Sequence, residues 1–144
     1  MSNPNIELAI SYYEALNRRA FDAYNVLFAD DVTFEAAGGV AGSGLETVKF
    51  FDHIWPAAFS DFTIEGIYHL GDGNRVVCYN RATGTHDGTL LMPDGSEVPA
   101  TGHKFNAPYF ASFEVRNGKI VSAHIYFDRM LLAEQLGLIP VASA

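Results

Sequence analysis

Residues 102–140 constrain the fold of this chain more than any other segment. On both sides of an Asn117-Gly118 turn, apolar residues alternate with mostly polar ones, and a short amphipathic helix ending near Gly137 follows. The residues that alternate to one side are Phe105, Ala107, Tyr109, Ala111, Phe113 and Val115, answered by Val121, Ala123, Ile125 and Phe127. Period-2 alternation predicts an antiparallel hairpin with one buried face and one partly polar face. The buried face is suited to enclosing something apolar.

Composition sets the size of the fold and excludes several partners. The 144 residues, 49% hydrophobic and 18% charged, fit a single domain over residues 1–144 that buries about two-thirds of its unfolded surface. A formal charge of -8, with nine scattered Lys and Arg, argues against binding to nucleic acid or to an anionic membrane. The single Cys78 excludes an internal disulfide, and no segment resembles a signal peptide or a spanning helix. We therefore expect a cytoplasmic protein with an uncharged or weakly charged partner.

Helices are expected before strands along the chain. Apolar residues at helical spacing predict helices over residues 5–17, 20–28 and 45–58, the last kinked or ended by Pro56. Strands are predicted over residues 32–35, 62–70 and 75–85, with a turn at 71–74, before the two long strands of the hairpin. Residues 38–44 read as a mobile Gly-rich loop, and residues 91–97 as a loop or turn. The expected class is α+β, with N-terminal helices packed on one face of a curved antiparallel sheet.

Several motifs together resemble one protein family over nearly the whole chain. They are Phe28-Ala29-Asp30-Asp31-Val32-Thr33-Phe34, Gly84-Thr85-His86-Asp87-Gly88, Asn117-Gly118-Lys119-Ile120, and Asp128 with Gln135-Leu136-Gly137. In these motifs the chain resembles the SnoaL-like polyketide cyclases, within the nuclear transport factor 2-like superfamily that includes ketosteroid isomerase and scytalone dehydratase. The resemblance implies a conical half-barrel of the cystatin-like type around an apolar pocket. It also implies a homodimer formed through the outer face of the sheet.

The family's catalytic positions hold other residues in this chain. The resemblance implies an aspartate near the middle of the last strand, supported by a glutamine and a histidine on the preceding strand, as the groups that perform an aldol closure. Counting from the shared turn, these places are held by Ile125, Tyr109 and Ala111. Isoleucine and alanine supply no base, so the family's own mechanism is not expected. Asp128 is interpreted as the residue that places the final helix, on the opposite face from Ile125.

Polar residues on the predicted inner faces are the remaining candidates for chemistry. His86 and His103 are candidate catalytic residues with Tyr109, because two imidazoles on adjacent strands can share acid and base roles near neutral pH. Scytalone dehydratase is similar in this respect, although its aspartate after the first helix has no match at residues 16–18. The candidate ligand-binding residues are Asn80, Phe34, Trp55, Tyr13, Ala111, Ile125 and Phe127. Structural roles are the alternative: the histidines as strand-end residues, and Tyr109 as a core residue with one hydroxyl partner.

No metal or cofactor is expected, since the histidines (His53, His69, His86, His103 and His124) never fall at the close spacing of a local ligand pair. Two hypotheses for function remain. The first is a cofactor-independent isomerase, dehydratase or cyclase acting on a polyketide-, terpenoid- or steroid-like ring compound. The second is a non-catalytic domain of the same fold that binds an apolar small molecule or mediates an interaction. The predicted dimer face carries His124, Tyr126, Asp128, Tyr79 and Arg81.

Overall fold

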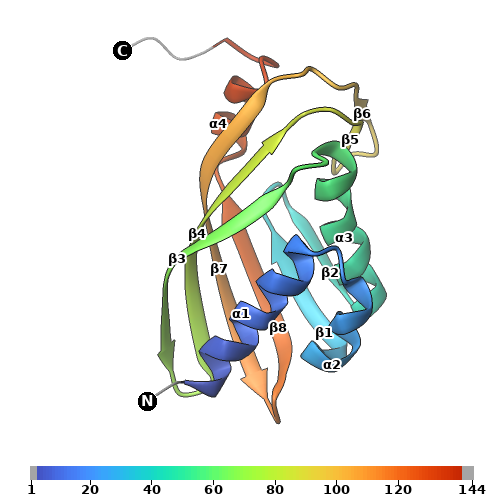
Figure 1. Ribbon diagram of the computed structural model, residues 1–144. Coiled ribbons are helices and arrows are strands. Elements are labelled where there is room, and N and C mark those ends of the chain that lie inside the picture. The colour runs from blue at the N-terminus through green and yellow to red at the C-terminus, as the bar shows by residue number, and fades with distance from the viewer. Residues whose placement is uncertain (1–2, 141–144) are drawn as a thin grey trace.

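The fold is a six-stranded sheet with helices packed on one face, as seen in a computed structural model that describes residues 3–140 (Figure 1). The strands are β1 (Phe28–Ala36), β2 (Val40–Ser43), β3 (Thr63–Asp72), β4 (Arg75–Thr85), β5 (Leu90–Leu91), β6 (Glu97–Val98), β7 (Lys104–Arg116) and β8 (Lys119–Phe127). The helices are α1 (Pro4–Asn17), the 3-10 helix η1 (Phe21–Ala23), α2 (Tyr24–Leu27), α3 (Leu45–Ala58) and α4 (Arg129–Gln135). The predicted α+β class is confirmed. The ends of the predicted domain, residues 1–2 and 141–144, lie outside the described residues.

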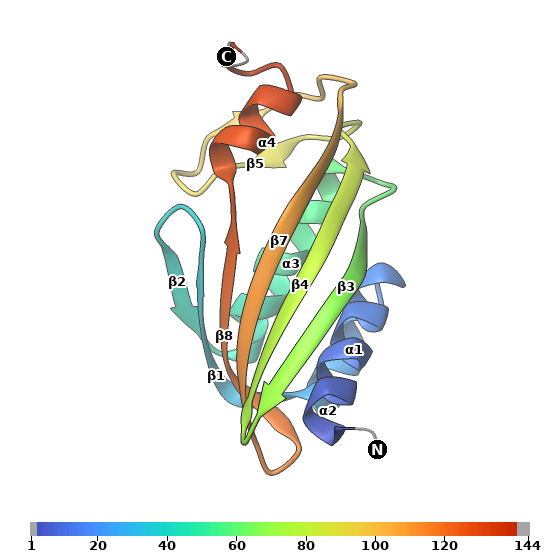
Figure 2. The ribbon, with the colours of Figure 1, turned by 90° about the vertical axis from the view of Figure 1, so that its left-hand side faces the viewer.

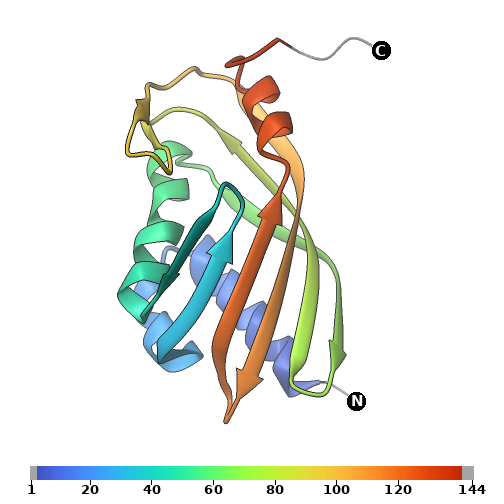
Figure 3. The same ribbon diagram turned by 180° about the vertical axis from the view of Figure 1, so that it is seen from behind.

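The large sheet is mixed and not antiparallel throughout. Its strand order is β2-β1-β8-β7-β4-β3, and β1 pairs with β8 in parallel, while the other neighbouring pairs are antiparallel. Alternation within a strand reports which face is buried, but it does not report the direction of the neighbouring strand. Figure 2 shows β7, β4 and β3 side by side with α3 behind them, and Figure 3 shows β1 and β2 beside β8.

The inner face of the sheet carries the alternation that the sequence predicts. On β7 the buried residues are Phe105, Ala107, Tyr109, Ala111, Phe113 and Val115, and on β4 they are Val76, Cys78, Asn80, Ala82 and Gly84. The last strand departs from the prediction, because a register shift at Glu114 and Val115 turns Ile120 inward in place of Val121. A β-bulge of this kind reverses the facing of every residue on one side of it.

The segments before the hairpin differ from prediction in their boundaries. The predicted second helix ends earlier, because Phe28 pairs with Ile120 and already belongs to β1. The predicted loop over residues 38–44 contains β2, which forms a hairpin with β1 through Gly38 and Gly39, both with positive φ. The pairing of Phe28 with Ile120 joins residues that are distant in sequence, and the pairing of β1 with β2 depends on a tight turn. The spacing of apolar residues along a local segment reveals neither pairing.

Two further elements confirm predictions. Helix α3 ends at Ala58 with Pro56 in its last turn. Asp128 lies before α4 and accepts a hydrogen bond of 3.0 Å from the backbone N–H of Leu131, which is the geometry of an N-cap. Asp128 therefore places the final helix, as predicted. Within residues 3–140, no helix is both long and apolar enough to cross a membrane.

Candidate functional site

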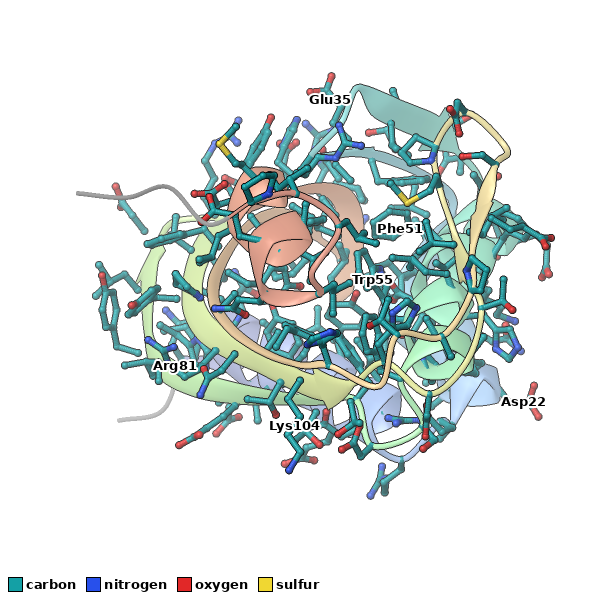
Figure 4. The ribbon with its side chains drawn as sticks, turned by 90° about the horizontal axis from the view of Figure 1, so that it is seen from above. Asp22, Glu35, Phe51, Trp55, Arg81 and Lys104 are labelled. Carbon is teal, nitrogen blue, oxygen red and sulfur yellow. The ribbon has the colours of Figure 1, made fainter. Side chains whose placement is uncertain are left out.

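An apolar cavity of about 50 Å³ lies between α3 and the inner face of the sheet. We call it the inner cavity. Its walls include Leu16 of α1, Trp55 of α3, Tyr109 of β7, and Ile125 and Phe127 of β8. Viewed from above, Phe51 and Trp55 point from α3 toward the middle of the molecule, while Glu35 and Asp22 lie at its periphery (Figure 4). Among the described residues that line the inner cavity, Asp52 alone carries a charge.

Asp52 is almost fully buried, with 2% of its surface exposed. Its Oδ2 atom accepts two short hydrogen bonds, from the hydroxyl of Tyr12 at 2.7 Å and from the hydroxyl of Tyr24 at 2.6 Å. Its Oδ1 atom accepts none within residues 3–140. Burial raises the pKa of Asp52 from 3.8 to about 6, against the two tyrosine hydrogen bonds, which lower it. The site thus holds a carboxylate with one fixed oxygen and one uncommitted oxygen, and its pKa lies near neutrality.

Three helical segments create this arrangement. Leu45, Val48, Asp52 and Trp55 follow one another at spacings of three and four residues, so they share the buried stripe of α3. Tyr12 arrives from α1 and Tyr24 from α2, and their rings pack edge to face with centroids 5.4 Å apart. Asp52 lies on a helix, whereas the catalytic residues predicted from the sequence lie on strands or at strand ends, so Asp52 was not among them. One feature of the sequence could have indicated Asp52 as a site residue. It is a carboxylate at a position of the predicted helix where the spacing of the apolar residues predicts an apolar side chain.

The predicted ligand-binding residues separate into three groups. Trp55, Ile125 and Phe127 line the inner cavity together with the predicted catalytic Tyr109. Phe34 lines a wider space outside it. Ala111, Tyr13 and Asn80 are buried but line neither space. The hydroxyl of Tyr109 is held in its neutral form, because burial and then the charge of Asp52 raise its pKa.

Asn80 and Tyr13 belong to a buried polar cluster that adjoins Tyr109, whose ring centroid lies 6.2 Å from that of Tyr13. The side-chain amide of Asn80, the hydroxyl of Tyr13 and Nδ1 of His69 are all buried, and the hydroxyl of Tyr13 interacts with the side chains of Tyr109 and Asn80. A bulge in β3 between Gly66 and Tyr68 shifts the facing of the strand at this point, and the ring of His69 stacks on that of Tyr13. Buried polar groups of this kind commonly bond to internal water. The role of Asn80 in ligand binding stays a prediction.

The two candidate catalytic histidines lie side by side at the end of the sheet. The backbone N–H of His86 donates to the carbonyl of His103 at 2.8 Å. The buried ring of His86 packs on Phe59, with Nδ1 2.9 Å from the hydroxyl of Thr101, and burial lowers its pKa. His103 is exposed. Neither residue lines the inner cavity or the space outside it, and their catalytic roles stay predictions.

Outside the inner cavity lies a wider space of about 600 Å³, which we call the outer groove. It is bounded by β2, α3, β5 and α4. Phe51, Trp55, Phe127 and Leu132 line both spaces, so these residues form the boundary between them. The rings of Trp55 and Phe127 meet there almost at right angles, with centroids 5.4 Å apart. The outer groove has the volume of a typical small-molecule site, whereas the inner cavity has room for about four water molecules.

Within residues 3–140, no three His, Cys, Asp or Glu side chains are grouped in a way that could hold a metal ion. Asp52 and Tyr109 lie together in the inner cavity.

The fold and its enclosed apolar interior define a cone-shaped α+β protein of the nuclear transport factor 2-like class. The sequence profile of the SnoaL-like polyketide cyclases matches residues 7–136, and the chain belongs to that family. This confirms the family resemblance. No curated protein matches the chain.

Solved structures share this fold. A protein from Jannaschia sp. CCS1, assigned to the SnoaL-like polyketide cyclases, superposes with a TM-score of 0.84 at 18% identity, over 95% of this chain and 94% of that one. IdmH from Streptomyces antibioticus, assigned as a polyketide cyclase, gives a TM-score of 0.78 at 25% identity, over 92% and 98% of the two chains. AclR from Streptomyces galilaeus, assigned as a hydroxylase, gives 0.80 at 21% identity, over 96% and 84%.

Proposed function

We propose that the protein is a cofactor-independent acid–base enzyme of the isomerase, dehydratase or cyclase type. Its substrate is a hydrophobic, oxygen-bearing ring compound of the polyketide, terpenoid or steroid kind. The observation that carries this proposal is the uncommitted Oδ1 atom of Asp52, a buried carboxylate with a pKa of about 6 in an otherwise apolar cavity. Perturbed carboxylates in apolar cavities are typical of sites that move protons.

In the proposed reaction, Asp52 removes a proton from a carbon next to a substrate carbonyl. The C–H bond breaks, the proton passes to Oδ1, and the electron pair moves into the enolate. The neutral hydroxyl of Tyr109 donates a hydrogen bond to the developing oxyanion. Returning the proton to a different carbon completes an isomerisation. Attack of the enolate carbon on a second carbonyl gives cyclisation, with the proton passing from Asp52 to the new alkoxide oxygen. Expulsion of a β-hydroxyl group, which takes the proton from Asp52 and leaves as water, gives dehydration.

Tyr12 and Tyr24 hold the base in position in this mechanism. Both hydroxyls donate to Oδ2, which directs Oδ1 as the reactive oxygen. In the family, by resemblance, the carboxylate comes from the last strand, where this chain has Ile125. Ile125 lines the same inner cavity as Asp52. We infer that α3 supplies from the opposite wall the carboxylate that the last strand lacks.

The pH dependence of turnover tests this proposal. Since Asp52 must be ionised to act as the base, kcat/KM on a panel of ring ketones is expected to rise as the pH increases through about 6 and to level off above it. Steady-state rates between pH 5 and 8 measure the profile. A profile without an inflection between pH 5 and 7 would contradict Asp52 as the base.

The same assay separates the alternatives. Unchanged turnover in His86→Ala and His103→Ala, made singly, would remove the histidine mechanism. A non-catalytic binding domain remains the second candidate function, favoured by the almost wholly apolar lining of the inner cavity. It would be supported if an apolar dye bound while no panel member was turned over.

We also propose that the protein forms a homodimer through the outer face of the sheet. Four aromatic residues form a row across β3, β4, β7 and β8. Tyr68 and Tyr79 have ring centroids 5.2 Å apart, Tyr79 and Phe110 are stacked at 4.7 Å, and Phe110 lies opposite Tyr126 in the strand register. Phe110 and Tyr126 are 45% and 51% exposed. An exposed aromatic row on a sheet face is typical of a protein interface.

Phe110→Glu is expected to raise the dimer dissociation constant at least about a hundredfold, because it places a charge in the centre of the apolar row. Light scattering after size-exclusion chromatography measures the mass as a function of concentration. The matched control is Val26→Glu, which adds the same charge at an exposed residue of α2. Equal masses for both variants would argue against this face as the interface.

A further inference from the structure

Among residues 3–140, one charged residue lines the inner cavity and one lines the outer groove, and the two charges are opposite in sign. Among the described residues, Asp52 is the charged residue of the inner cavity and Arg129 that of the outer groove. Because the two spaces share a boundary at Trp55 and Phe127, a ligand that spans them meets both charges. A negative group on that ligand is repelled by Asp52 and attracted by Arg129, so the two residues together select one orientation.

The position of Arg129 is built by the chain around it. Its guanidinium lies against Gly38 in the turn between β1 and β2, where an added Cβ would come within 2.9 Å of Cζ. The atoms that this Cβ would meet are the flexible end of the Arg129 side chain, and it is the positive φ of 91° that favours glycine at this place. The guanidinium thus lies beside the β1–β2 turn, and Arg129 lines the outer groove.

Arg129 has no hydrogen bond and no ion pair to any of residues 3–140. Oδ1 of the nearby Asp94 accepts hydrogen bonds from the backbone N–H and the hydroxyl of Ser96, at 2.9 and 2.6 Å, and these bonds and then the charge of Arg129 lower the pKa of Asp94. The guanidinium is therefore available to an outside partner. In a chain with a formal charge of -8, an uncommitted arginine on an apolar groove is a local exception that favours an anion.

We propose that the outer groove takes an apolar ligand bearing a carboxylate, which Arg129 binds with two parallel hydrogen bonds, while the uncharged ring end points through the boundary toward Asp52. This inference rests on the proposed function and narrows its substrate to a ring compound with an acidic substituent. The net charge of the chain led us to expect an uncharged or weakly charged ligand. The ligand proposed here is instead anionic at one end. Guanidinium and carboxylate match in geometry, which makes arginine suited to this recognition.

The test uses two probes that differ in one charge, 2-naphthoate and its methyl ester. Trp55 is the single tryptophan of the chain and lines both spaces, so its fluorescence reports occupation of this site, and calorimetry gives the affinities. Arg129→Gln is expected to weaken 2-naphthoate about tenfold and to leave the ester unchanged. Arg129→Lys keeps the positive charge but loses the two parallel donors of the guanidinium. Its affinity for 2-naphthoate is expected to lie between those of the native protein and Arg129→Gln. The matched control is Arg18→Gln, which makes the same charge change at an exposed residue beyond α1.

The outcomes separate this inference from the proposed function. Equal weakening by Arg129→Gln and Arg18→Gln, or no weakening by either while both probes still bind, would overturn the anion site and leave the acid–base proposal standing. Failure of both probes to bind the native protein would overturn the outer groove as a ligand site. If Asp52→Asn left turnover unchanged while Arg129→Gln still weakened 2-naphthoate binding, the catalytic proposal alone would be overturned.

Discussion

Asp52→Asn is expected to give a protein that is more stable at neutral pH but at least about a hundredfold slower in turnover. The amide keeps the shape of the carboxylate, and its oxygen can still accept from Tyr12 and Tyr24. It cannot act as a base, so the rate falls by the contribution of general base catalysis, about 10² to 10⁴. Opposite changes in stability and activity are the expected signature of a group retained for chemistry at a cost to folding.

The sign of the stability change follows from the raised pKa. Between pH 4 and 6 the folded protein binds more protons at Asp52 than the unfolded chain, so the free energy of unfolding falls as the pH rises through this range and stays lower above it. A rise of the pKa from 3.8 to about 6 corresponds to about 3 kcal/mol. This is the upper limit of the gain in Asp52→Asn at pH 7.5, because the new amide N–H groups offset part of it.

Urea unfolding between pH 4 and 7.5 measures this effect. The stability difference between Asp52→Asn and the native protein is expected to grow as the pH rises from 4 to 6. Asp22→Asn, which makes the same charge change at an exposed residue of η1, is the matched control and should show no such growth (Figure 4). A difference that is independent of pH would show that burial does not raise the pKa of Asp52.

Gly88→Ala is expected to lower the free energy of unfolding by about 3 kcal/mol. A Cβ at this position would lie 2.2 Å from the backbone carbonyl oxygen of Ala57, in the last turn of α3. The backbone N–H of Gly88 donates to the carbonyl of Ala58 at 3.0 Å, so the loop after β4 is held against the helix end. Separating them moves the end of α3, which carries Trp55, and should also weaken ligand binding in the inner cavity.

Thermal and urea unfolding measure the change, and Trp55 fluorescence reports on the helix end. Thr89→Ala, at an exposed neighbouring residue, is the control and should stay within about 0.5 kcal/mol of the native protein. A Gly88→Ala protein as stable as the control would mean that α3 and the loop can separate without cost.

Much of the fold could be predicted because its strands are amphipathic in a regular way. Alternation on β7 identified the buried residues correctly, and the Gly-rich turn at 71–74 joins β3 to β4 as predicted. The predictions were wrong where pairing over a distance decides the structure. The bulge at Glu114 and Val115 turns Ile120 inward, and the parallel pairing of β1 with β8 makes the sheet mixed.

The candidate site was less accessible to sequence reasoning than the fold. Alternation along β7 and β8 predicted Tyr109, Ile125 and Phe127 on the inner face, and all three line the inner cavity. His86 and Asn80 were also predicted on the inner side, and both are buried. Alternation could not show that neither residue lines the inner cavity. The extent of a cavity depends on the side chains that fill the space between layers.

The sequence by itself determined the family, the α+β class and the buried face of β7, because these depend on local periodicity and on short motifs. Only the tertiary structure decided that Asp52, Tyr12 and Tyr24 meet, since three helical segments up to 40 residues apart in sequence must pack at particular angles to bring the hydroxyls to one oxygen. It also decided that Gly88 touches α3 and that Arg129 faces the outer groove. These contacts join segments that are far apart along the chain, and separation in sequence does not predict distance in space.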